Sequence, residues 1–301
     1  MSIDRHYIPE EEFPKELAPG VHMLGNYFFN LFLIQGSDKS ILYETAVSGV
    51  VDAVIQQVRQ LGVTPDIIVP SHPHSDHITG LPGLREAFPK AELMAATGAR
   101  AFVEHPKAGP LLIKEDGFIS QGLERMDLPP QREPLAVIPD MADCREINQD
   151  TILDLGGRDI HLLTATGHSP GNLMAWLPKE GILFCADSLG FHYPGRGIWP
   201  LFFTGAVPYM ETLEQIQKLK PAILCPAHQG SLYGKDATRA VELSLETTRE
   251  LIRRIKTTDQ GEEQLAKELF RESYKDEFTL YTEENIKNCS RLLIKRAQQV
   301  E

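Results

Sequence analysis

One short stretch limits the fold and chemistry of this chain more than any other, because it holds three histidines and an aspartate within six residues. Its sequence is Ser71-His72-Pro73-His74-Ser75-Asp76-His77, a His-x-His-x-Asp-His pattern. Residues 66–70 form an apolar, β-branched run before it, which is typical of a buried strand. Residues 79–88 indicate the start of a helix, with Thr79 as its cap and Pro82 in the first turn. The pattern therefore predicts a strand-to-helix loop, where a rigid scaffold usually presents chemistry.

The spacing of these side chains predicts a metal site. Alternate side chains of an extended backbone point to the same side, so His72 and His74 can converge on one ion. Once the chain turns, Asp76 and His77 point elsewhere and are near enough to hold a second ion. Imidazole and carboxylate together suit zinc, iron or manganese, whereas an all-oxygen set suits calcium or magnesium. The alternative interpretation is a polar, solvated loop.

Composition sets outer limits on the class of protein. With 301 residues, 42% hydrophobic and 24% charged, the chain fits one large globular domain or a domain with an appendage. The net charge of −12 argues against a nucleic-acid partner, because phosphate binding needs a basic surface. No apolar run approaches a membrane span, and residues 1–14 lack the apolar core of a signal peptide. The four scattered cysteines form no CxxC pair, so we expect reduced thiols in a cytoplasmic protein.

Hydrophobic patterns predict two groups of strands, each followed by helices. Strands are predicted at 21–24, 27–34, 40–43, 66–70 and 93–95, and again at 151–155, 159–163, 173–177, 182–185 and 222–225. Helices are predicted at 50–61, 99–104, 209–219, 235–255, 262–270 and 282–297, the last capped by Thr282. The proline-rich stretch 105–150, with a helix at 111–126, is either a lid or a surface excursion. This order predicts an α+β protein with two sheets face to face and helices outside.

Three further fragments place a candidate ligand where a predicted strand ends. His168 lies between two glycines in Gly167-His168-Ser169-Pro170-Gly171, while Asp187 and His228 each follow an apolar strand. Taken singly, each is an ordinary loop or turn residue. Taken with the first motif, all can face the same edge of the sheets, and five of the ten histidines then share one explanation.

These residues together resemble the metallo-β-lactamase superfamily over roughly residues 20–235. The resemblance implies an αββα sandwich with a metal site at one edge, as a catalytic domain at 1–235. The helices at 236–301 then form a C-terminal helical extension that packs on it. By resemblance the ligands of a first ion are His72, His74 and His168. Those of a second ion are Asp76, His77 and His228, and Asp187 bridges both. Two divalent metal ions are implied, with zinc expected first and iron or manganese as alternatives.

Within the superfamily, the helical C-terminus is more similar to the glyoxalase II-like thioesterases than to the drug-resistance lactamases. Residues 184–190 and 42–45 also resemble the quinolone-response branch of aminobenzoylacetyl thioesterases. Asn172 departs from glyoxalase II, which commonly has a second histidine there. The resemblance implies a metallo-hydrolase whose metal-bound hydroxide, oriented by Asp76, attacks the carbonyl of a small-molecule thioester, ester or lactone.

Two other functions stay open. One is an iron-dependent oxidoreductase resembling the persulfide dioxygenases, and the other is a non-enzymatic regulator that keeps its metal. Substrate contacts are predicted from His192 and Tyr193, in the loop after Asp187, and from Tyr233 after His228. We expect no membrane partner, and a homodimer stays open as the assembly.

Overall fold

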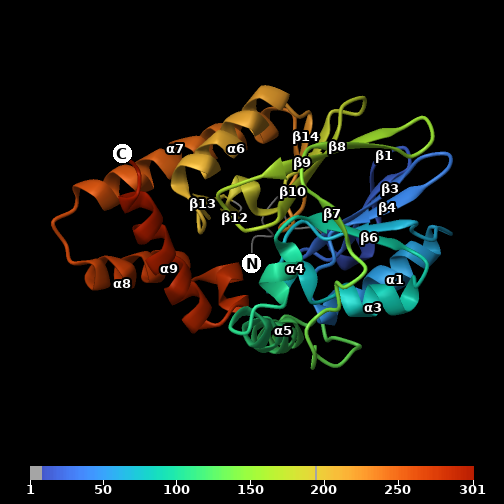
Figure 1. Cartoon of the computed structure of the whole chain (residues 1–301), viewed down its shortest axis with the longest axis horizontal. Helices are drawn as coiled ribbons and strands as arrows, with labels where there is room; N and C mark the ends of the chain where they lie inside the picture. Colours follow the sequence, from blue (N-terminus) through green and yellow to red (C-terminus); the bar gives the residue numbers. More distant parts are fainter. Residues whose placement is uncertain (1–8, 194) are drawn as a thin grey trace.

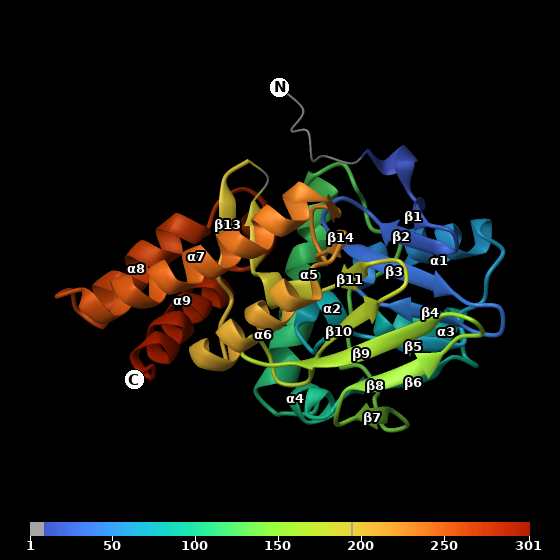
Figure 2. The same ribbon diagram turned by 90° about the horizontal axis from the view of Figure 1, so that it is seen from above.

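Two β-sheets pack face to face, with helices on both outer sides (Figure 1). The structure is a computed structural model that describes residues 9–193 and 195–301. Helices of the C-terminal part lie at one end of this sandwich, as the view from above shows (Figure 2). The arrangement confirms the predicted α+β class and the αββα sandwich with C-terminal helices.

The first sheet has seven strands in chain order. They are β1 (Lys15–Ala18), β2 (Val21–Gly25), β3 (Asn30–Gln35), β4 (Ser40–Tyr43), β5 (Ile67–Val69), β6 (Glu92–Ala96) and β7 (Arg145–Ile147). The strands from β1 to β4 are antiparallel, and those from β4 to β7 are parallel. Parallel strands need helical crossovers. These are α1 (Val51–Gln60), then α2 (Ser75–Ile78) with α3 (Leu81–Ala87), and finally α4 (Ala99–Val103) with α5 (Ala108–Arg125).

The second sheet has six strands in the order β15-β14-β11-β10-β9-β8. They are β8 (Thr151–Asp154), β9 (Asp159–Ala165), β10 (Asn172–Leu177), β11 (Ile182–Phe184), β14 (Ile223–Cys225) and β15 (Leu232–Tyr233). Between β11 and its parallel neighbour β14 lie the 3-10 helix η3 (Ala186–Leu189), the hairpin β12 (Phe191–Tyr193)–β13 (Gly197–Trp199) and α6 (Ala206–Leu219). The chain continues with α7 (Lys235–Thr257), α8 (Glu262–Ser273), η4 (Asp276–Leu280) and α9 (Glu283–Gln298).

Three apolar cores hold the four layers together. Between the sheets, the Phe32 and Phe184 rings lie 4.7 Å apart, and burial of each such ring contributes about 1.5–3 kcal/mol. The next residue along β3, Leu33, points to the opposite face and packs with α1. The second sheet packs against α6 and α7 in the same way. The C-terminal helices contribute to two of these cores, through Phe278 in one and Leu293 in the other.

Some predicted elements differ from the structure for local reasons. The strand predicted at 27–34 begins only at Asn30, because the Asn26 side chain accepts hydrogen bonds from the amides of Phe28 and Phe29 and holds a turn there. Thr79 does not cap the following helix, although Pro82 does lie in its first turn. Thr79 instead ends α2, and its hydroxyl oxygen lies 2.7 Å from the Ser75 carbonyl oxygen and 2.6 Å from Asp116 Oδ1. Thr282 caps α9 as predicted.

The stretch 105–150 is not a plain surface excursion, because α5 is anchored to the rest of the molecule by two buried carboxylates. Asp116 accepts from Ser48, Thr79 and Leu135, while Glu115 accepts from Thr282. The C-terminal helices are tied to this same helix. The division into a catalytic domain and an extension at residue 235 stays a prediction. Within the described ranges, none of the helices combines the length and apolarity needed to span a membrane.

Candidate metal centre

All seven predicted ligand side chains meet at one edge of the sandwich, where strands end. Four of them, His72, His74, Asp76 and His77, follow β5. The other three each follow another strand: His168 follows β9, Asp187 follows β11 and His228 follows β14. Two groups of four, sharing Asp187, have donor atoms that all lie within 4.8 Å of one another. We call His72, His74, His168 and Asp187 the first cluster, and Asp76, His77, Asp187 and His228 the second cluster. All except His74 are buried.

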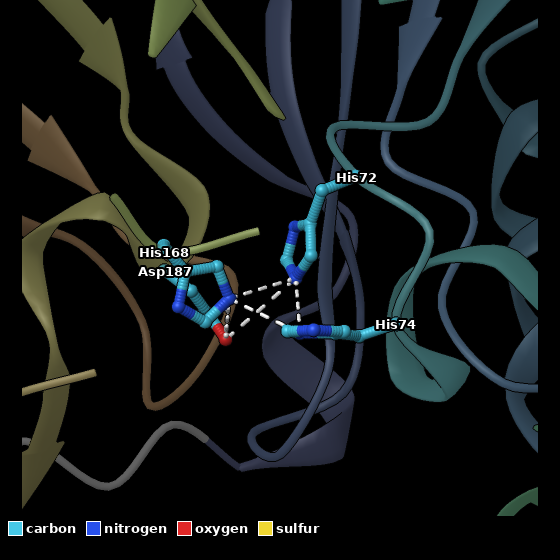
Figure 3. Close-up of side chains that lie close together, drawn as sticks. All are labelled: His72, His74, His168 and Asp187. Atoms are coloured by element: carbon cyan, nitrogen blue, oxygen red, sulfur yellow. Dashed lines mark hydrogen bonds and ion pairs between the residues drawn. The ribbon is translucent and has the colours of Figure 1, made fainter. Parts of the chain in front are cut away.

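In the first cluster, three imidazoles point at one spot from opposite sides (Figure 3). His72 Nε2 lies 3.0 Å from His74 Nδ1, and His168 Nε2 lies 3.1 Å from both of these atoms. Asp187 Oδ2 completes the group, 3.5 Å from His168 Nε2. Zinc–nitrogen bonds of about 2.0–2.1 Å in a tetrahedral site put ligand atoms about 3.3 Å apart. The spacing therefore fits a single small cation.

In the second cluster, two carboxylates and two imidazoles converge in the same way. His228 Nε2 lies 3.4 Å from Asp76 Oδ2 and 3.4 Å from Asp187 Oδ1. His77 Nε2 lies 3.4 Å from Asp76 Oδ2 and 3.5 Å from Asp187 Oδ2. Both Nε2 atoms are buried, and among the described residues neither makes a hydrogen bond of good geometry, although these carboxylate oxygens lie 3.4–3.5 Å away. A buried polar atom without a partner is costly, and a metal ion between these four residues removes that cost.

The other ring nitrogens are held by acceptors outside the clusters. His168 Nδ1 donates to the Leu201 carbonyl at 2.8 Å, and His228 Nδ1 donates to the Phe28 carbonyl at 2.7 Å. His77 Nδ1 lies 3.1 Å from the buried carboxylate of Glu44. Such contacts fix the orientation of a ring and leave its Nε2 lone pair for a metal. The sequence analysis missed Glu44 as a supporting residue, although it follows β4 at the same sheet edge.

The electrostatics of the clusters also favour a cation. Burial lowers the pKa of His74 to about 3 and also lowers that of His168, so these imidazoles are neutral donors. Burial raises the pKa of Asp76 and Asp187, but the nearby charge of His77 outweighs it and holds both pKa values well below the usual range. Burial lowers the pKa of His228, yet the two carboxylates raise it to about 9. Without a metal, the protonated imidazoles of His77 and His228 supply the positive charge beside these two carboxylates, and a bound cation would supply it in their place.

Two glycines allow His168 to reach the clusters. Gly167 has φ +98° and Gly171 has φ +65°, values that side-chain-bearing residues rarely adopt. A Cβ atom on Gly167 would lie 2.2 Å from the Tyr209 backbone nitrogen, and one on Gly171 would lie 2.5 Å from that of Ala99. The backbone on both sides of His168 therefore packs directly against helices α6 and α4.

We expect Gly167→Ala to destabilise the protein by about 3 kcal/mol, because it combines backbone strain with a clash against backbone atoms. Urea denaturation measures this change. Gly157→Ala is the matched control, since Gly157 also has a positive φ of +69° but nothing lies within 4 Å of the added Cβ. The control substitution should lower the free energy of unfolding by about 1 kcal/mol or less. Equal costs for the two variants would contradict this account of the His168 loop.

A cavity of about 470 Å³ opens onto the clusters, with His74, Asp76, His168 and Asp187 exposed to it. One wall comes from α4, α5 and the loops of the sandwich, and the opposite wall comes from η4 and α9. Nine large apolar side chains line it: Phe102, Leu111, Leu112, Phe191, Leu201, Phe203, Phe278, Ile286 and Leu292. Two cationic residues, Lys107 and Arg296, also line it, together with the carboxylate of Glu115. The cavity is therefore largely apolar, with positive charge along part of its wall.

The three predicted substrate contacts lie outside this lining. Tyr193 is buried, and its hydroxyl donates to the Ser273 carbonyl at 2.7 Å. His192 points to the opposite side of β12 from Phe191, and Phe191 is the residue of this strand that reaches the cavity. Tyr233 is 45% exposed, on β15 at the edge of the second sheet. Nearness in sequence to a ligand does not determine which way a side chain points.

One further residue touches a candidate ligand and was not predicted. The hydroxyl of Tyr281, between η4 and α9, donates to Asp76 Oδ2 at 2.7 Å. Tyr281 is buried and also lines the cavity. Its position, 205 residues after Asp76 and inside an amphipathic helical region, gives no local signal of such a contact.

Comparisons with known proteins agree with the fold and the site. YobT of Bacillus subtilis (strain 168), an uncharacterized protein, is 26% identical over 202 residues, 65% of this chain and 76% of that protein. The hydroxyacylglutathione hydrolase of Chelativorans sp. (strain BNC1) is 22% identical over 151 residues, 48% of this chain but only 44% of that protein.

Among solved structures, TTHA1429 of Thermus thermophilus, a metallo-beta-lactamase family protein, has the same fold. It superposes with a TM-score of 0.61 at 18% identity, over 90% of this chain and 93% of that chain. The model of the metallo-beta-lactamase superfamily matches residues 25–228, the part that contains both clusters. With this match over more than half of its length, the chain belongs to the metallo-β-lactamase superfamily.

Proposed function

We propose that the protein is a metal-dependent hydrolase of a small thioester, ester or lactone with an apolar acyl group. One observation carries the proposal: two ligand clusters share Asp187, and members of both line a largely apolar cavity. A cavity of this size suits a small-molecule ligand that buries most of its surface. The similarity to a hydroxyacylglutathione hydrolase favours a thioester among the three classes.

The residues present fit two divalent ions, and we propose zinc for both, held by the first and second clusters. When bound, such ions lower the pKa of a water molecule towards 7 and polarise a carbonyl group, as two-metal hydrolase sites do. The buried Nε2 atoms of His77 and His228 make no hydrogen bond of good geometry within the described residues, and both face two carboxylates, which supports a cation at this place. Iron and manganese suit the same mixed donors.

The chain's own residues then orient the reactants. Asp76 projects into the cavity, and its Oδ2 atom is held by the Tyr281 hydroxyl. We propose that Asp76 orients the attacking water, since it lines the cavity beside both clusters. The apolar walls exclude other water, which strengthens every electrostatic interaction inside.

The cavity also suggests what the substrate looks like. Its aromatic and aliphatic walls match an apolar acyl chain or ring. Lys107 near α5 and Arg296 on α9 supply positive charge, in a protein whose net charge is −12. We propose that they attract an anionic group on the leaving side of the substrate. Arg296 also holds the cavity loop, because its Nε donates to the Phe203 carbonyl at 3.0 Å.

The test is a panel of acyl thioesters, esters and lactones offered to the zinc-loaded protein. The thioesters should vary in acyl length and carry neutral or anionic thiols, so that thiol release reports both preferences. We expect turnover of at least one apolar acyl thioester, lost on metal removal, restored by zinc and lost in His72→Ala. The absence of turnover throughout, or turnover that survives both metal removal and His72→Ala, contradicts the proposal. Oxygen uptake with a persulfide by the iron-loaded protein, without ester turnover, would replace it by an oxidoreductase.

A further inference from the structure

Tyr281 makes a contact at the candidate metal centre that comes from outside the part matched by the superfamily model. Its hydroxyl donates to Asp76 Oδ2, the same oxygen that lies 3.4 Å from both His77 Nε2 and His228 Nε2. A carboxylate oxygen has two lone pairs, so one can accept this hydrogen bond while the other faces a cation. The contact therefore orients the Asp76 carboxylate towards the imidazoles of His77 and His228, the other side of the second cluster.

The backbone around Tyr281 is itself fixed by two elements. Thr282, the cap of α9, donates its backbone amide to the buried carboxylate of Glu115 on α5 at 3.1 Å. The Thr282 hydroxyl donates to the other oxygen of the same carboxylate. The Tyr274 hydroxyl donates to the Tyr281 carbonyl at 3.1 Å. Tyr281 therefore reaches Asp76 from a rigid support, and little conformational freedom is lost in making the bond.

We propose that Tyr281 is a positioning residue that holds Asp76 in the orientation the second cluster needs, so that the C-terminal helices complete the metal centre. The inference rests on the proposed metal centre and not on which bond is hydrolysed. If the inference holds, only the second cluster depends on Tyr281 for its metal affinity. Tyr281 contacts Asp76, which belongs to the second cluster alone, so its loss acts on one ion and not on both.

The variant to examine is Tyr281→Phe, which removes the hydroxyl and keeps the ring in its apolar surroundings. Loss of a group that supports a metal ligand typically weakens metal binding about 10- to 100-fold. We expect the full-length variant to bind one zinc ion as tightly as the wild type and a second at least about 10-fold more weakly. Titration of the metal-free protein with zinc against a competing chelator measures both steps without any use of hydrolytic activity.

Tyr193→Phe is the matched control. Its hydroxyl is also buried in a tyrosine that packs on Phe278, and it also bonds to the C-terminal helices, through the Ser273 carbonyl at 2.7 Å. It touches none of the candidate ligands in the described part of the chain. Thermal unfolding of the metal-free proteins should show similar losses for both variants, while only Tyr281→Phe should alter the second zinc step. Cobalt loading adds a spectroscopic check, because a changed second site alters the absorption of the second equivalent.

The possible results separate clearly. Unchanged binding of both ions in Tyr281→Phe overturns the inference, and so does equal weakening of both steps, which indicates a general structural role. A wild-type protein that binds a single ion with an affinity that Tyr281→Phe leaves unchanged overturns it as well. If the second step weakens but no ester or thioester is hydrolysed even by the wild type, the proposed hydrolase function fails and this inference stands.

Discussion

Replacing Asp187 with alanine should leave the protein with at most one tightly bound ion per chain and reduce the proposed hydrolytic activity about a thousandfold or more. Asp187 is the residue that both clusters share. Its Oδ2 lies 3.5 Å from both His168 Nε2 and His77 Nε2, and its Oδ1 lies 3.4 Å from His228 Nε2. Without it the second cluster keeps one carboxylate and two imidazoles, while the first keeps its three imidazoles. Elemental analysis of the dialysed protein and a single-turnover assay measure the two effects.

A matched control separates this loss from a general effect of removing an acidic side chain. Asp159→Ala removes an exposed aspartate at the start of β9, remote from the clusters in the fold, and should change neither metal content nor rate. Thermal unfolding of metal-free Asp187→Ala should show that the variant is folded. If Asp187→Ala retained two ions and the rate of the wild type, Asp187 would not be a shared ligand.

Asp116→Ala should destabilise the protein by about 3–5 kcal/mol, the largest stability effect that we expect from a single polar residue here. Asp116 is fully buried on α5 and accepts four hydrogen bonds. Two come from the amide and hydroxyl of Ser48, at 2.9 and 2.5 Å. The others come from Thr79 Oγ1 at 2.6 Å and from the Leu135 amide at 2.7 Å. Alanine leaves the two buried Ser48 donors and the partly buried Leu135 amide without this acceptor, while Thr79 can still donate to the Ser75 carbonyl.

Chemical denaturation measures this cost, and Glu124→Ala on the same helix is the control. Glu124 is exposed, so its removal should change the free energy of unfolding by about 0.5 kcal/mol or less. A similar, small effect of both substitutions would show that α5 is not anchored through Asp116. Because Thr79 ends α2, which carries Asp76 and His77, the variant should also bind the second ion more weakly.

The parts of the site that could be predicted from sequence are those that local patterns specify. The apolar run of β5 fixes where a strand ends, and the residues after it, from His72 to His77, must lie at that sheet edge. The same reasoning places His168, Asp187 and His228 after β9, β11 and β14, and the structure brings all seven side chains together. Because the ends of neighbouring strands lie at the same edge of the sandwich, polar residues that follow several strands come close together.

The Tyr281 contact and the cavity could not be predicted, because they depend on contacts between residues far apart in the sequence. Tyr281 reaches Asp76 only because α9 packs beside α5, and that packing rests on Glu115 and Thr282, 167 residues apart. The cavity forms between these same helices. His192 and Tyr193 show that closeness in sequence to a ligand does not place a side chain in the cavity. Both lie close in sequence to Asp187, but strand alternation in β12 and the bond from Tyr193 to Ser273 direct them away from the cavity.

We infer that seven side chains from distant parts of the chain bind two cations. Diffraction from crystals of the zinc-loaded protein, recorded on both sides of the zinc absorption edge, would locate both ions. We predict two anomalous peaks, about 3.5–4 Å apart. One lies about 2.0–2.2 Å from the donor atoms of His72, His74 and His168, and the other lies at the same distance from Asp76, His77 and His228. Asp187 lies between them. The absence of peaks there, or zinc bound only elsewhere on the protein, would contradict the account.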